Sequence, residues 1–200
     1  MPIPSRQIRA VFDAETITVY QAYSPAIAEP ALAAQTFVAP FKRERMTWIK
    51  PSFLWMMYRC GWASKPGQER VLAVRITREG FAWALAHSCG SHPAEGEAVE
   101  DWKARLAAAP VRVQWDPERG PGLERLEHRS IQIGMSGEAV DRYTGQWITA
   151  IEDVTDLAAR IGAAVAAGRG DEARDLLPVE RAYPLTDALA AAAGASQARP

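Results

Sequence analysis

The sequence predicts an α+β protein with a mainly antiparallel sheet, and two observations lead to this prediction. Segments in which apolar residues alternate, as is typical of strands, share the chain with segments in which they follow helical spacing. The two kinds do not alternate strictly, as they would in a parallel α/β fold. The 200 residues suit one domain, which we expect over residues 1–185, followed by a flexible alanine-rich tail over 186–200.

Strong local signals mark the elements of the first 90 residues. One or two strands are expected over 8–23, where β-branched residues are frequent. Ser24 and Pro25 favour a helix that continues to residue 34. The later elements are expected as a loop over 37–50, a helix from 51 to Gly61, a strand over 70–77 and a helix over 78–86.

The second half of the chain gives similar signals. Strands are expected over 111–115 and 129–134, and a cluster of Gly and Pro over 116–122 predicts a turn between them. A loop is expected over 90–100. The helical segments are expected over residues 102–109, 138–151, 156–167 and, for a short turn, 171–177.

Composition excludes several classes of protein. The net charge of −1 and 48% hydrophobic residues are average for a globular domain, which rules out a disordered or fibrous chain. No window approaches ~18 uncharged apolar residues, so we expect no membrane partner. The first residues do not resemble a secretory signal and two cysteines are too few for a disulfide framework, so a cytoplasmic location is expected.

Positive charge and tryptophan are concentrated between residues 41 and 78. This segment holds nine Lys and Arg residues and three of the seven Trp residues, and Lys50 lies between apolar neighbours beside a proline. Cations neutralise phosphates and aromatic rings stack on bases, so the combination suits a nucleotide or nucleic-acid site. Alternatively, Trp48, Trp55 and Trp62 form one buried helical face, with arginines extending from its edges.

Familiar catalytic motifs are absent. The sequence contains neither of the common glycine-rich phosphate loops, and it has no G-x-S-x-G nucleophile elbow. His87, Cys89 and His92 are close in sequence, but a fourth metal ligand is not evident nearby, so we expect no metal.

Several segments together resemble an uncharacterised bacterial and fungal family known only as a domain of unknown function. The resemblance covers about residues 5–185, and its most distinctive part is the Trp-Ile-Lys-Pro-Ser-Phe motif over 48–53. It implies no activity. The segments that carry it are residues 8–10, 18–23, 46–59 and 129–134.

The same segments are more weakly similar to the ADP-ribosyltransferase fold, whose members cleave NAD in a cleft between two small antiparallel sheets. That similarity implies a split sheet with flanking helices and NAD as substrate. The strand over 17–23 would bring a polar NAD-binding group, and the segment 46–52 a Ser or Tyr near the nicotinamide. The residues so implied for cofactor binding are Arg9, Tyr20, Gln21, Trp48, Lys50 and Ser52.

The resemblance also implies where the catalytic acid would lie. The strand over 129–134 would carry the glutamate that stabilises the developing oxocarbenium ion, but this chain has Gln132 at about that place. Glutamine can bind the ribose, yet it cannot supply the negative charge. Glu138, a few residues later, is the alternative acid.

Three functions remain open from the sequence. The first is an NAD-using transferase acting on nucleic acid, protein or a small molecule. The second is a non-catalytic protein that binds a nucleotide or nucleic acid, and the third is a structural or partner-binding protein whose Trp residues are all core. The first function would be favoured if the following residues converged on one cleft: Arg9, Tyr20, Gln21, Lys50, Ser52 and Gln132.

Overall fold

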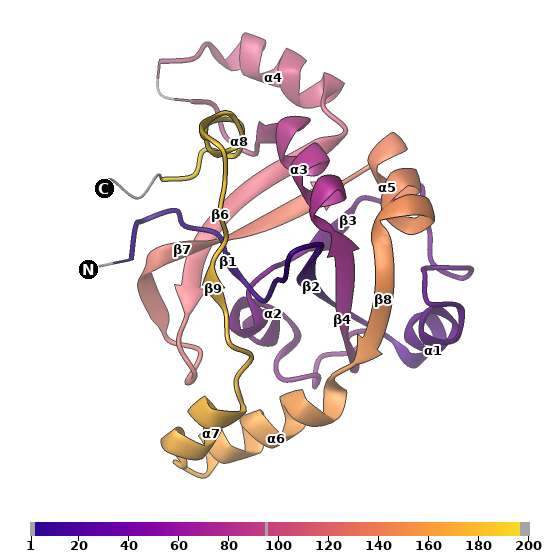
Figure 1. Ribbon diagram of the computed structural model, residues 1–200, viewed down its shortest axis with the longest axis vertical. Coiled ribbons are helices and arrows are strands. Elements are labelled where there is room, and N and C mark those ends of the chain that lie inside the picture. The colour runs from indigo at the N-terminus through magenta and orange to yellow at the C-terminus, as the bar shows by residue number, and fades with distance from the viewer. Residues whose placement is uncertain (1–2, 95, 197–200) are drawn as a thin grey trace.

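The computed structural model describes residues 3–94 and 96–196 and confirms the α+β prediction (Figure 1). Its strands form three small sheets, in which every pair is antiparallel except the parallel pair β5–β6. One sheet has the order β2 (Thr16–Tyr23), β4 (Arg70–Thr77), β8 (Ile148–Asp153). A second has the order β3 (Thr47–Ile49), β7 (Arg125–Met135), β6 (Val111–Arg119), β5 (Ser88–Gly90). The third pairs β1 (Arg9–Ala10) with β9 (Arg181–Ala182).

A backbone bridge joins the two larger sheets. The backbone N–H of Tyr20 donates to the carbonyl of Lys50 at 2.7 Å, and the N–H of Lys50 donates back at 3.3 Å. The bridge joins β2 to the residue that follows β3, so the sheet is split at this point, as expected. Lys50 therefore lies at the junction of the two sheets.

Helices flank both sheets (Figure 1). Within the described ranges, none of them combines the length and the apolar character that a membrane span requires. The helical elements are α1 (Pro25–Ala34), α2 (Phe53–Cys60), α3 (Arg78–Ala86), α4 (Val99–Ala108), α5 (Glu138–Arg142), the π-turn η1 (Tyr143–Trp147), α6 (Thr155–Ala166), α7 (Gly170–Leu176) and α8 (Asp187–Ala193).

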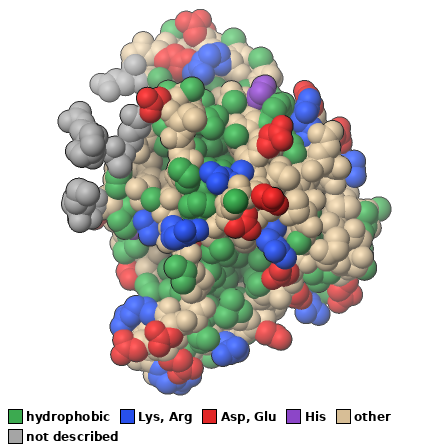
Figure 2. Space-filling view, viewed as in Figure 1, with side chains coloured by type: hydrophobic (Ala, Val, Ile, Leu, Met, Phe, Trp, Pro, Cys, Tyr) green, Lys and Arg blue, Asp and Glu red, His purple; other side chains and the backbone are tan. Residues whose placement is uncertain are grey.

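Alternation along the strands divides the interior into two clusters. Ile17 and Val19 on β2 point into the main core, where they meet Ile133 of the four-stranded sheet. Tyr20 points to the opposite side, into a smaller cluster that α2 and α6 cover with Phe53, Ile161 and their neighbours. Charged side chains of both signs gather at the α6–α7 end of the molecule (Figure 2), where Arg169 pairs with Glu172 and Arg174 with Asp171.

The helix predicted over 138–151 is confirmed over residues 138–147, as α5 and η1, and is wrong from residue 148 onward. Helix α5 ends at Arg142, the chain widens into η1, and residues from Ile148 onward form β8, which pairs with β4. Ile148, Thr149 and Ile151 are β-branched residues that fit a strand, and the partner strand lies about 75 residues earlier in the chain. Helical spacing alone could not show this pairing.

Other elements also differ from the sequence-based prediction, which did not include the short strands β5 and β9. The expected loop over 37–50 contains β3, and β6 continues through the expected turn as far as Arg119. A flexible tail was expected over 186–200, whereas residues 187–193 form α8, whose Ala190 and Ala193 are buried. The indole N–H of Trp115 donates to the Ala193 carbonyl at 2.8 Å, which attaches α8 to β6. Residues 197–200 lie outside the described part of the chain.

Candidate functional site

The motif over residues 48–53 leads from β3 into α2. Ile49 points into the main core, and Lys50 forms the bridge between the sheets. Ser52 then caps α2, because its hydroxyl accepts the backbone N–H of Trp55 at 3.1 Å. The helix ends at Gly61, whose φ of 61° places it in the left-handed conformation typical of a helix C-terminus.

A cavity of about 170 Å³ lies at the N-terminus of α2, and we call it the acid pocket. The walls come from β1, the start of α2, the ends of β6 and β7, and the segment that leads to β9. The lining residues are Arg9, Ser52, Phe53, Leu54, Glu118, Arg119, Leu126, His128, Leu177, Pro178 and Glu180.

Two glutamates are held at consecutive residues of the α2 N-terminus. The Ser52 hydroxyl donates to Oε1 of Glu118 at 2.9 Å, and the backbone N–H of Arg119 donates to the same oxygen at 2.8 Å. The backbone N–H of Phe53 donates to Oε1 of Glu180 at 2.7 Å. Hydrogen-bond donors at the start of a helix favour a negative charge there, so both carboxyls are oriented by α2.

Burial raises the pKa of both carboxyls, so both are weaker acids than an exposed glutamate. Burial raises the pKa of Glu118 even though hydrogen bonds from Arg119, Ser52 and Ser130 oppose the shift. Burial, together with repulsion from Glu118, raises the pKa of Glu180 to about 8, against the opposing bond from Phe53. With its pKa of about 8, the Glu180 carboxyl can donate or accept a proton near neutral pH.

The remaining charged groups of the pocket are basic. Burial and the nearby Arg9 lower the pKa of His128, which favours its neutral form. The guanidinium of Arg9 donates to the Glu180 carbonyl at 2.9 Å and to Gln7 at 3.1 Å. The pocket therefore combines proton-transfer groups with a cation, an arrangement suited to general acid–base work on a substrate that carries an anionic group.

The six residues that would line one cleft in an NAD-using transferase do not lie together in this structure. Arg9 and Ser52 line the acid pocket. Tyr20 lines a neighbouring cavity of about 340 Å³ that shares Phe53 and Pro178 with it. Burial raises the pKa of the Tyr20 hydroxyl well above its usual value.

Gln21 lies in the interior, where its side chain connects three elements. The amide nitrogen donates to Thr47 and Tyr23, both at 2.8 Å, and the amide oxygen accepts the hydroxyl of Tyr143 at 2.6 Å. Gln21 is only 2% exposed. These contacts assign Gln21 a structural position between β2, β3 and η1.

Trp48, Lys50 and Gln132 lie on the outer face of the four-stranded sheet. Trp48 is paired with Gly134 across β3 and β7, and its half-buried indole covers that glycine. The amide of Gln132 donates to Oδ2 of Asp116 at 2.8 Å. Lys50 is only 6% exposed, and its Nζ lies 5.4 Å from the ring centre of Trp55.

The two residues suggested as catalytic lie outside the acid pocket. The side-chain amide of Gln132 donates a hydrogen bond to Asp116. Glu138 is exposed on α5, where it forms an ion pair with Arg142 at 2.6 Å. The expectation for a purely structural protein also differs from the structure. Trp55 is buried, but Trp48 and Trp62 are only half-buried, and Lys50 is buried instead of extending into solvent.

Sequence reasoning missed Glu118, His128 and Glu180. Glu118 fell in the predicted turn over 116–122, although alternation of polar residues at 112, 114, 116 and 118 continues the strand and could have indicated it. Glu180 follows Pro178 and Val179 in a segment without regular structure, and no local signal marks it.

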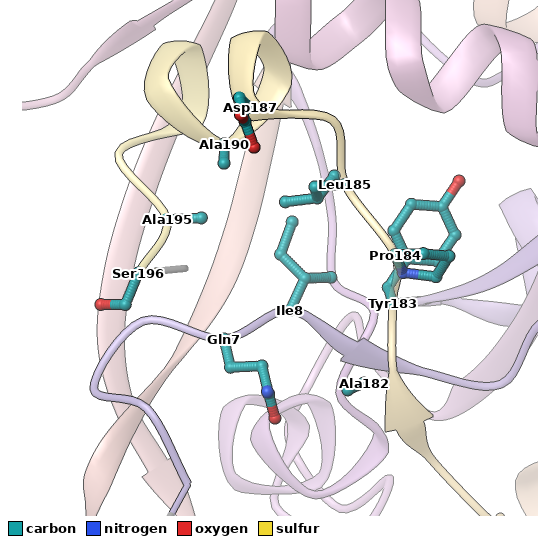
Figure 3. A pocket seen from close by; sticks show the side chains of 10 residues that line it. All are labelled: Gln7, Ile8, Ala182, Tyr183, Pro184, Leu185, Asp187, Ala190, Ala195 and Ser196. Atoms are coloured by element: carbon teal, nitrogen blue, oxygen red, sulfur yellow. The ribbon is translucent and has the colours of Figure 1, made fainter. Parts of the chain in front are cut away.

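A larger cavity of about 350 Å³ lies between α8 and the N-terminal segment (Figure 3). Ile8, Leu185 and Ala190 contribute apolar surface to it, and Asp187 is the one acidic residue among those that line it. Within the described residues, no group of three or more His, Cys, Asp or Glu is placed to hold a metal ion. The acid pocket is therefore the stronger candidate for chemistry.

The fold and the site define an α+β protein with a split antiparallel sheet and two buried acids at one helix N-terminus. The chain belongs to the family described as Domain of unknown function (DUF4291), whose family model matches residues 7–183. This confirms the resemblance to a family without an assigned activity. No curated protein matches the chain.

Proposed function

We propose that the protein transfers ADP-ribose from NAD and that the acid pocket holds the nicotinamide–ribose end of the substrate. The hydrogen bond between Ser52 and Glu118 carries this proposal. It places a serine of the distinctive motif on a buried carboxyl, in a cavity that also contains Arg9. Glu118 thus takes the part that the ADP-ribosyltransferase resemblance assigned to Gln132 or Glu138.

The chemistry requires an acid at the ribose. The bond between the ribose carbon and the nicotinamide nitrogen breaks, and the electron pair leaves with neutral nicotinamide. The ribose carbon, now an oxocarbenium ion, forms a new bond to an acceptor oxygen or to water, whose proton passes to a carboxylate of the pocket. A Glu118 carboxylate held by Ser52 stabilises this cation without needing to reorganise.

The volume and the charge of the acid pocket and the adjoining cavity support NAD as the substrate. The acid pocket accommodates part of a dinucleotide, and the adjoining cavity beside Tyr20 gives room for more. Arg9 is half-buried and takes part in none of the ion pairs between described residues, so its charge is available to a phosphate. A cytoplasmic location, where NAD is available, belongs to this proposal.

Release of nicotinamide from NAD tests the proposal. The wild-type protein should release nicotinamide, and Glu118→Gln should lower the rate by about 100-fold or more, because it removes the charge that stabilises the cation. Glu138→Gln is the matched control, since Glu138 is exposed and ion-paired, and it should keep the wild-type rate. No release by the folded wild-type protein, or equal loss in both variants, would overturn the proposal.

A further inference from the structure

We propose that the outer face of the β3–β7–β6 sheet, together with α2, binds the phosphates of single-stranded nucleic acid. We call this surface the donor face. Its defining side chains are Lys50, Trp55, Arg59, Arg112 and Arg119. This binding would not require NAD, so it goes beyond the proposed transferase activity and can be tested separately.

The donor face contains cations that have no acid partner. The ion pairs between described residues leave out Lys50, Arg59, Arg112 and Arg119. By contrast, the arginines at positions 169 and 174 both have acid partners. Four cations that form no ion pair on one surface give it a positive potential, which favours a negatively charged ligand.

Several buried donors of this face also lack an acceptor. The indole nitrogen of Trp55 and the Nε atoms of Arg112 and Arg119 are buried without any hydrogen-bond partner. None of the hydrogen bonds between described residues involves Nζ of Lys50, which lies beside the Trp55 ring. Buried polar groups are rarely left unsatisfied, and the side chains of Arg112 and Arg119 are only half-buried, so acceptor oxygens at the surface can reach these two guanidinium groups.

The side chains are close enough to form one surface. Nζ of Lys50 lies 5.4 Å from the ring of Trp55, and the guanidinium of Arg119 lies 3.5 Å from the ring of Tyr58. The rings of Trp55 and Tyr58 are themselves 6.4 Å apart. Arg59 follows on the same helix and acts on Lys50 electrostatically. Helix α2 therefore places the exposed ring of Tyr58 and the buried ring of Trp55 beside the cations.

Two carboxylates of β6, Asp116 and Glu118, lie on this side of the strand, and both are already engaged: Glu118 accepts the Ser52 hydroxyl and the backbone N–H of Arg119. Asp116 accepts the amide of Gln114 at 2.9 Å with one oxygen and the amide of Gln132 at 2.8 Å with the other. It attracts Lys50 without forming an ion pair with it. The net charge of the donor face remains positive.

The spread of the cations and the exposed rings favour a strand over a single nucleotide. Arg112 and Arg119 are seven residues apart on β6, about 23 Å at the usual rise of a strand, which is far more than one phosphate spans. Tyr58 is 41% exposed and Trp48 is half-buried over Gly134, so both offer ring surface to bases. Stacking together with phosphate contacts is the usual mode of binding single strands.

Fluorescence anisotropy with a labelled 12-nucleotide RNA of mixed sequence tests the proposal. The wild-type protein should bind with a dissociation constant of about 1–100 μM at 50 mM salt, and the affinity should fall steeply toward 200 mM. Arg59→Gln and Arg112→Gln should each reduce the salt slope by about one. Lys50→Met should weaken binding at least about tenfold, provided that its thermal unfolding shows a folded protein.

Arg160→Gln is the matched control, because Arg160 is an exposed cation on α6 with no ion pair between described residues. It should bind RNA like the wild type. The proposal fails if RNA does not bind, if Arg160→Gln weakens binding as much as Arg59→Gln, or if adenosine monophosphate displaces RNA at concentrations comparable with an unlabelled strand.

Discussion

Replacing Ser52 with alanine removes two hydrogen bonds from the start of α2. The first is the N-cap bond to the backbone of Trp55, whose loss costs about 1 kcal/mol. The second is the bond to Glu118, which contributes about 0.5–1.5 kcal/mol because the same oxygen keeps the backbone N–H of Arg119 as a donor. The free energy of unfolding of Ser52→Ala should therefore fall by about 1.5–2.5 kcal/mol.

Thr77→Ala provides the matched control for this prediction. Thr77 caps α3 by accepting the N–H of Gly80 at 3.1 Å, and its hydroxyl makes no bond to a carboxyl, so its loss should cost only about 1 kcal/mol. Urea unfolding at pH 7, followed by tryptophan fluorescence, measures both values. If Ser52→Ala and Thr77→Ala cost the same, the bond to Glu118 contributes nothing and our reasoning about the motif is refuted.

Three further predictions concern packing and pH. Gly80→Ala should lower the free energy of unfolding by about 1–3 kcal/mol, because its new Cβ would lie 2.3 Å from a ring carbon of Trp147, whereas Gly145→Ala meets open space and should be neutral in the same urea assay. Glu180 has a folded-state pKa of about 8, so its stabilising contribution is complete below about pH 4.5 and is lost as the pH rises through 8; Glu180→Gln should abolish this decline, and an unchanged pH profile would contradict it. Burial lowers the pKa of Lys50 to about 8, so the wild type should gain stability between pH 8 and 10.5 relative to Lys50→Met, and parallel stability curves for the two proteins would refute this.

Elements with complete local signals could be predicted from the sequence. The strand over 70–77 and the helix over 78–86 are confirmed, since an alternating apolar run leads directly to Thr77 as an N-cap. The helix that begins after Ser52 and ends at Gly61 is confirmed for the same reason. In each case, the residues that determine the element lie within it or at its ends.

Features that depend on distant partners could not be predicted. Strand β8 was mistaken for helix because its partner β4 is far away in the chain. The acid pocket depends on Ser52 and Glu118, which are 66 residues apart, and on Glu180, which is 127 residues from its donor Phe53. The motif over 48–53 contains Ser52, which lines the acid pocket, but the acids held there became visible only in the fold.

The central claim is that the nicotinamide–ribose end of NAD binds against Ser52 and Glu118. A crystal structure of the wild-type protein with a non-hydrolysable carbocyclic NAD analogue tests this claim most directly. We predict density for the analogue in the acid pocket, with a ribose hydroxyl within about 3.2 Å of a Glu118 oxygen. An analogue bound elsewhere on the protein, or an empty acid pocket at millimolar analogue, would contradict the account.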